Sequence, residues 1–236
     1  MSTDEKLILA LDVADYDYAV ELIETFFPLI EIFKVGLELH TIAGLKIIEA
    51  IHKRGKKVFL DLKFHDIPTT VAKAGAEATK LNVSIFDLHA LGGFEMMRKT
   101  VEVSRATAKE LGIPKPLILA ITILTSMDED TLNEVGIRGP ILEEVGQLAL
   151  LAMKAGMDGV VASPKEIGII RQQCGEKFLI VTPGIRLPSD KKDDQKRTMS
   201  PKEAITAGAT YLVIGRPIKE AKDPLEAVQR IVEDIS

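Results

Sequence analysis

Short apolar runs recur along the whole chain, and each is too short to form a helix. They are rich in Val, Ile, Leu and Phe, and most lack a regular alternation with polar residues. Continuous apolar runs of this length are typical of parallel strands that are covered on both faces. The runs span residues 7–12, 32–36, 58–63, 85–90, 117–122, 159–163, 179–184 and 211–216.

The stretches between these runs have the spacing of amphipathic helices. In GLKIIEAIHKRG, for example, Ile47, Ile48 and Ile51 share one helical face, and Gly55 supplies a C-terminal stop. The order of strand and helix repeats eight times and ends with a helix predicted at PLEAVQRIVEDI. Eight β–α units predict an α/β protein, a single (β/α)8 TIM barrel with eight parallel strands that forms one domain over residues 1–236.

A doubly wound open sheet is the competing architecture. Its dinucleotide-binding fingerprint requires glycines after the first strand, and LILALDVADYD contains none. The chain also lacks a P-loop. Two loops, 125–140 and 187–201, are longer than the pattern needs and follow the fifth and seventh runs. In a barrel both would lie at the carboxyl ends of strands, where active sites are found.

Composition narrows the classes of function. A net charge of −5, no tryptophan and only three tyrosines argue against a nucleic-acid partner. A single cysteine, Cys174, excludes an intramolecular disulfide framework. The longest apolar stretch is far shorter than the ~20 residues of a membrane span, and the first residues lack the order of a secretory signal. We therefore expect a cytoplasmic protein with no membrane and no nucleic-acid partner.

Charged residues cluster at the ends of the first three predicted strands. Asp12 ends the first, Lys34 lies in the second, and Asp61, Lys63 and Asp66 lie at or just after the end of the third. Strand alternation predicts that Asp61 and Lys63 share one face. Buried charges are tolerated when they are paired, so an alternating network at the barrel mouth is expected. Taken alone, an Asp–Lys pair on a strand end is more often a purely structural ion pair, but the density of charges in LDLKFHDI favours a functional site.

The last two predicted strands end in glycine and arginine. The seventh runs into TPGIR, with Gly184 and Arg186, and the eighth runs directly into Gly215 and Arg216. Loops after strands seven and eight are where barrels of this type bind phosphate, through free backbone N–H groups and arginine forks. The glycines could instead simply form tight turns.

Eight segments together resemble the orotidine 5′-phosphate decarboxylase family. These segments, in family order, are LILALD, FKVGLEL, LDLKFHDIPTT, HALGG, LTS, VTPGIR, a loop glutamine and VIGRPI. The resemblance runs from about residue 8 to the final helix. It implies decarboxylation of orotidine 5′-monophosphate to UMP and carbon dioxide in pyrimidine biosynthesis, without a metal or organic cofactor, by a homodimer with shared active sites.

The resemblance also implies roles for individual residues. Lys34, Asp61, Lys63 and Asp66 correspond to the catalytic residues, with Lys63 as the proton donor and Asp66 reaching into the site of the neighbouring subunit. The implied substrate-binding residues are Asp12, Lys34, Asp61, Asp66, Ile67, Thr69, Thr70, Thr125, Ser126, Arg186, Gln195, Gly215 and Arg216.

Two other functions remain as alternatives. Related sugar-phosphate enzymes, such as a metal-dependent keto-sugar phosphate decarboxylase or a hexulose-phosphate synthase, keep D-x-K-x-x-D and use acids to hold magnesium. They would be expected to carry an acid near the end of the second strand, where this chain has Lys34. A catalytically silent phosphate-binding barrel would be expected to lose the four charged residues and keep Arg216.

Overall fold

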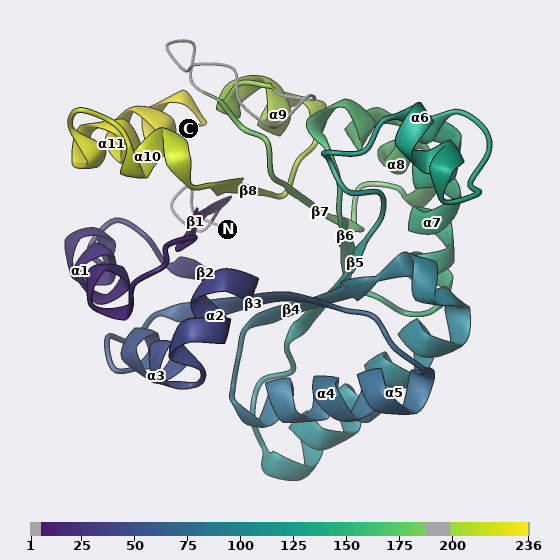
Figure 1. Cartoon of the computed structure of the whole chain (residues 1–236), viewed down its shortest axis with the longest axis horizontal. Coiled ribbons are helices and arrows are strands. Elements are labelled where there is room, and N and C mark those ends of the chain that lie inside the picture. Colours follow the sequence, from purple (N-terminus) through teal and green to yellow (C-terminus); the bar gives the residue numbers. More distant parts are fainter. Residues whose placement is uncertain (1–5, 187–198, 236) are drawn as a thin grey trace.

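A closed barrel of eight parallel strands forms the centre of the computed structural model, which describes residues 6–186 and 199–235 (Figure 1). The strands follow one another around the barrel in chain order, and β8 pairs with β1 to close it. They are β1 (Leu7–Ala10), β2 (Ile32–Gly36), β3 (Lys57–Phe64), β4 (Ile85–His89), β5 (Leu117–Ile121), β6 (Gly159–Val161), β7 (Leu179–Thr182) and β8 (Tyr211–Ile214). The predicted TIM barrel is thus confirmed, and each strand overlaps its predicted run.

Helices surround the strands, as Figure 1 shows. The α-helices are α1 (Tyr16–Phe26), α2 (Leu37–Ala43), α3 (Lys46–His52), α4 (Pro68–Lys80), α5 (Gly93–Leu111), α6 (Glu129–Glu134), α7 (Ile141–Lys154), α8 (Ile167–Cys174), α9 (Pro201–Ala207), α10 (Arg216–Lys219) and α11 (Pro224–Asp234). Short 3₁₀ turns, η2 (Ala90–Gly92) and η3 (Pro164–Glu166), precede α5 and α8. No helix in the described parts of the chain is both long enough and apolar enough to cross a membrane.

After three of the strands, β2, β5 and β8, the chain forms two α-helices where the sequence pattern predicted one. Gly44, with φ of +56°, ends α2 and separates it from α3. In the long loop after β5, Asp128 accepts a hydrogen bond from the backbone N–H of Thr131 and caps α6. After β8, α10 precedes the predicted last helix, α11. These additional helices are short, so their periodicity is too weak to be recognised in the sequence.

Two apolar layers are separated by the sheet. Side chains including Ile8, Phe59 and Leu119 form a small cluster inside the barrel. Their sequence neighbours, such as Leu7 and Leu9, belong to the larger cluster that includes residues of the helices. Burial of both strand faces explains why the runs are continuously apolar.

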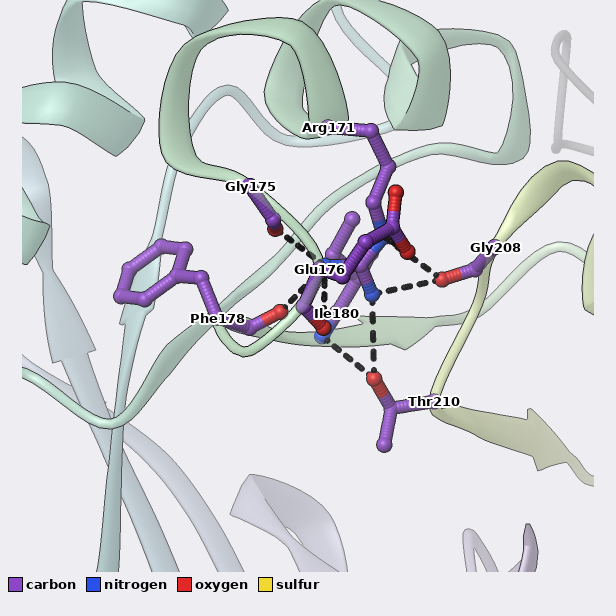
Figure 2. Close-up of polar contacts among 7 residues, drawn as sticks. All are labelled: Arg171, Gly175, Glu176, Phe178, Ile180, Gly208 and Thr210. Carbon is purple, nitrogen blue, oxygen red and sulfur yellow. Dashed lines mark hydrogen bonds and ion pairs between the residues drawn. The ribbon is translucent and has the colours of Figure 1, made fainter.

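Arg171 in α8 ties the amino ends of β7 and β8 together (Figure 2). Its guanidinium donates to the backbone oxygens of Phe178, at 2.6 Å, and Gly208, at 2.6 and 3.0 Å. Thr210 Oγ1 accepts from Arg171, at 3.3 Å, and from the backbone N–H of Ile180, at 3.1 Å. This network fixes two strands whose carboxyl ends carry the glycine and arginine segments.

Candidate active site

The carboxyl ends of the strands surround a cavity of about 450 Å³. Its floor is apolar and comes from the strands themselves. The apolar strand residues that line it are Ala10, Phe59, Ile121, Val161 and Val213. Charged side chains and residues of the loops that follow the strands line the rest. A concave pocket with an apolar floor and convergent polar groups at this end of a barrel is the expected form of a ligand site.

Four charged side chains form an alternating chain on one side of the cavity. Lys34 Nζ lies 2.8 Å from Asp12 Oδ1 and 2.9 Å from Asp61 Oδ2. Asp61 in turn forms an ion pair with Lys63. The Lys34 and Asp61 side chains are only 9% and 10% exposed. The structure therefore brings together Asp12, Lys34, Asp61 and Lys63, which come from three neighbouring strand ends.

The ion pairs decide the charge state of the buried members. Burial alone would lower the pKa of Lys34, but Asp61 and Asp12 raise it above its ordinary value. Burial would likewise raise the pKa of Asp61, but Lys34, a hydrogen bond with Asp87, and Lys63 hold it well below its usual range. Both groups are therefore charged at neutral pH.

Gly36 makes room for the contact between Asp12 and Lys34. A Cβ atom at residue 36 would lie 2.8 Å from Asp12 Oδ1 and 3.1 Å from Lys34 Nζ. A side chain at this position would push the two charged groups aside, so glycine permits their close approach.

The end of β3 departs from simple alternation. Its pairing with β4 shifts between Leu60 and Phe64, and Lys63 has a φ of +50°. As the sequence pattern predicted, Asp61 and Lys63 lie on one side of the strand, where both line the cavity and form an ion pair. The pattern did not predict the bulge, in which the backbone N–H of Lys63 donates to Asp87 Oδ1 at 2.8 Å.

A second group of residues lines the cavity from β7 and β8. Gly184, Arg186, Gly215 and Arg216 all border it. Gly184 has a φ of +77°, a backbone conformation that favours glycine. The backbone N–H of Arg186 donates to the oxygen of Met199 at 3.1 Å, which anchors the segment after β7. Two arginines and two glycines at one side of the cavity are suited to binding an anion.

Lys219 also lines the cavity, although the sequence pattern did not identify it. Its Nζ donates to the backbone oxygen of Asp12 at 2.5 Å, and burial lowers its pKa. Lys219 follows Arg216 by three residues in α10, so the two share a helical face. This spacing of three residues from Arg216 is the feature of the sequence that could have identified Lys219.

Other sequence-predicted residues lie at the edge of the cavity or away from it. Thr125 lines it, whereas Ser126 is exposed and does not. Gln195 lies outside the residues that the structure describes. Four residues after β3 are exposed and do not line the cavity of this subunit: Asp66, Ile67, Thr69 and Thr70.

A family model, relatives of known name and a solved structure all match this chain over nearly its whole length. The model of the orotidine 5′-phosphate decarboxylase / HUMPS family matches residues 5–231. Orotidine 5′-phosphate decarboxylase of Geotalea daltonii is 52% identical over 238 residues, which cover 100% of this chain and 99% of that protein. The enzyme of the same name from Geobacter sulfurreducens is 53% identical over 232 residues, with 98% and 96% covered. The crystal structure of orotidine 5′-phosphate decarboxylase from Lactobacillus acidophilus matches with a TM-score of 0.84 and 36% identity, covering 99% of this chain and all of that chain.

Proposed function

This chain belongs to the orotidine 5′-phosphate decarboxylase / HUMPS family, and we propose that it converts orotidine 5′-monophosphate to UMP and carbon dioxide through Lys34, Asp61 and Lys63. The enzyme is a carboxy-lyase of pyrimidine biosynthesis. The observation that carries the proposal for the site is the alternating chain of charges at one side of a cavity that two arginines also line.

The reaction needs charge stabilisation and a proton. The bond between C6 of the pyrimidine and its carboxylate breaks, carbon dioxide leaves, and the electron pair stays on C6. The ring offers no obvious electron sink for this pair, so catalysis depends on preorganised charge and on proton delivery. The ammonium of Lys63 stabilises the developing carbanion and then protonates C6. Solvent returns a proton to the neutral amine.

Asp61 acts on the departing group. Its pKa is well below the usual range, so it is ionised and carries its charge beside Lys63. A substrate carboxylate bound against Asp61 experiences repulsion, and this repulsion ends as carbon dioxide forms. Lys34 lowers the free-energy cost of placing the two carboxylates together, because its Nζ lies 2.9 Å from Asp61 Oδ2 and keeps Asp61 in a fixed position.

The remaining lining residues suit the rest of the nucleotide. Arg186 and Arg216 bind the 5′-phosphate together with the backbone N–H groups of the neighbouring glycines, and Gln195 contributes from the loop after β7. Asp12 and Lys34 hold the ribose hydroxyls. Thr125 and Ser126 face the pyrimidine. Binding energy from the remote phosphate can thus serve the chemistry at C6.

The position of Lys34 supports catalysis without a metal or organic cofactor. Its ammonium lies within 2.9 Å of one oxygen of Asp12 and one of Asp61, and it supplies the positive charge that these carboxylates need. A metal-dependent sugar-phosphate enzyme would be expected to carry an acid in its place. The charged residues also argue against a catalytically silent phosphate-binding barrel, because all of them are present.

We propose in addition that two subunits share their active sites. Asp66 and its neighbours after β3 lie outside the cavity of their own subunit and are exposed. Ile67 is 64% exposed, and Leu91 and Phe94, which follow β4, are each 41% exposed. A second copy of the chain would cover these residues and place Asp66 at the neighbouring cavity.

Mixing two inactive variants tests the shared site. Lys63→Ala and Asp66→Ala proteins are expected to be inactive alone and to recover about a quarter of the wild-type activity when their subunits exchange freely. About half of the dimers would then be hybrids, and each hybrid has one site with an intact Lys63 and the partner's intact Asp66. The measurement is turnover of orotidine 5′-monophosphate before and after exchange.

The matched control mixes Lys63→Ala with Asp61→Ala. Asp61 and Lys63 form an ion pair within one chain, so no hybrid of these variants has a complete site and no activity should return. No recovery with Asp66→Ala, once mass spectrometry has shown that subunits exchanged, would refute the shared site.

A further inference from the structure

Asp87 lies opposite the bulge that carries two of the proposed catalytic residues. In the pairing of β3 with β4, Leu60 is opposite Phe86 and Phe64 is opposite Leu88. Three residues of β3, including Asp61 and Lys63, therefore face the single residue Asp87. The bulge interrupts the ladder between the two strands, and the carboxyl group of Asp87 accepts the backbone N–H of Lys63 at 2.8 Å.

This hydrogen bond stabilises an unfavourable backbone conformation. Lys63 has a φ of +50°, and among the described residues Asn82 is the only other non-glycine residue with a positive φ. Residues other than glycine rarely adopt this left-handed backbone conformation, because their Cβ atom approaches the following carbonyl oxygen. Such strain persists where the surroundings hold it, and it concentrates at functional sites. The hydrogen bond from the backbone N–H of Lys63 to Asp87 stabilises this backbone conformation.

The carboxyl group of Asp87 forms no ion pair within the described residues, although the charge of Lys63 acts on it. Its residue is 0% exposed. If the group were ionised, its second oxygen, Oδ2, would have no hydrogen-bond partner in the same part of the chain. An ionised carboxylate that is buried without an ion-pair partner and with one unsatisfied oxygen is disfavoured.

A proton on Asp87 satisfies the unpaired oxygen. Burial and the neighbouring negative charge of Asp61 raise the pKa of Asp87 well above its usual range. A hydrogen bond between the two side chains then has Asp87 as the donor and Asp61 as the acceptor, and it helps to hold the pKa of Asp61 low. Asp61 thus has three partners, Lys34, Lys63 and Asp87. Because protonated Asp87 is neutral, the alternating chain keeps two positive and two negative charges.

We propose that Asp87, in its protonated form, is the positioning residue of this active site. One oxygen fixes the backbone of Lys63, and the protonated oxygen orients Asp61, so that both side chains stay aligned on the reacting carbon and carboxylate. The proposal rests on the proposed function, because it assigns Asp87 a role through the residues that perform that reaction. Asp87 itself does not line the cavity.

The test compares Asp87→Asn with Asp87→Ala. Asparagine keeps an acceptor for Lys63 and a donor for Asp61 without a charge, so kcat is expected to stay within about threefold of wild type. Alanine removes both bonds. We expect kcat to fall about 100-fold, because a small misplacement of catalytic groups is enough for such a loss. Because Asp87 acts on the reacting groups, the KM for orotidine 5′-monophosphate and the Kd for UMP should change little.

Asp158→Ala is the matched control. Asp158 also accepts a strand N–H, that of Ile118 at 2.9 Å, but it does so at the amino end of the barrel. Its loss should lower thermal stability and leave kcat unchanged. A wild-type kcat in Asp87→Ala, or an Asp87→Asn protein that is folded and as impaired as the alanine variant, would overturn the proposal.

Infrared spectroscopy gives a readout that does not depend on turnover. The wild-type protein at neutral pH is expected to show the carbonyl band of a protonated carboxylic acid that Asp87→Asn lacks and Asp158→Ala keeps. Absence of that band would overturn the protonated state, whether or not the protein decarboxylates orotidine 5′-monophosphate. If Asp87→Ala fails to fold, the band and the asparagine variant still decide the question. A wild-type protein that shows the band and does not turn over would instead refute the proposed function.

Discussion

Replacing Lys63 with alanine is expected to lower kcat for orotidine 5′-monophosphate by at least about four orders of magnitude. The variant loses both the proton donor and the positive charge nearest the developing carbanion. These two effects act mainly in the transition state. The Kd for UMP, which lacks the departing carboxylate, should therefore stay within about tenfold of wild type. Stopped-flow turnover and calorimetric titration with UMP measure the two quantities.

Lys109→Ala is the control for the removal of a lysine. Lys109 is exposed near the end of α5 and does not line the cavity, so its kcat should equal that of wild type. A Lys63→Ala protein that is folded and retains substantial kcat would remove Lys63 from the chemistry. Equal losses of kcat and of UMP binding would instead indicate a structural ion pair with Asp61.

Arg216→Ala is expected to weaken UMP binding and raise the KM for orotidine 5′-monophosphate by about 100-fold. Arg216 borders the cavity directly after β8, next to Gly215, and its guanidinium can form a charge-assisted pair with a phosphate. Uridine has no phosphate, so its affinity should change by no more than about threefold. Calorimetric titrations with UMP and with uridine measure this difference.

Arg98→Ala serves as the matched control for Arg216. Arg98 lies on the exposed face of α5, where it pairs with Glu95 and Glu102 away from the cavity. Its replacement should leave both ligands unaffected. If Arg216→Ala weakened uridine as much as UMP, Arg216 would have no specific role in phosphate binding.

Much of this architecture could be predicted from the sequence, because the buried strands are continuous apolar runs whose ends are marked by charge or glycine. The repeat of strand and helix placed the ends of the first three strands at one mouth of a barrel. Asp12, Lys34, Asp61 and Lys63 meet there within hydrogen-bond distance. Topology alone sufficed for this, since parallel strands all end on the same side.

The departures from the prediction depend on the register between strands. Simple alternation placed Asp61 and Lys63 together, but the bulge opposite Asp87 and the positive φ of Lys63 arise from how β3 pairs with β4. A single acidic residue in the apolar run IFDLH gives no indication of what it faces. Lys219 was missed for a related reason, because the short helix α10 after Gly215 is not evident from the apolar pattern.

Residues that serve a second subunit cannot be assigned from one chain. Asp66 and Thr70 are exposed in this structure, and only the family resemblance gives them a role. Their isolation from the cavity of their own subunit is consistent with that role. The hybrid-dimer experiment is therefore the appropriate test for them.

Decarboxylation without a metal is the central claim, and one assay tests it most directly. Purified protein is mixed with orotidine 5′-monophosphate in EDTA, and the near-ultraviolet absorbance is followed. The account predicts a rapid loss of absorbance, with UMP and carbon dioxide as products in equal amounts. No loss with folded protein, or a loss only after magnesium is restored, would contradict it and favour a metal-dependent sugar-phosphate enzyme.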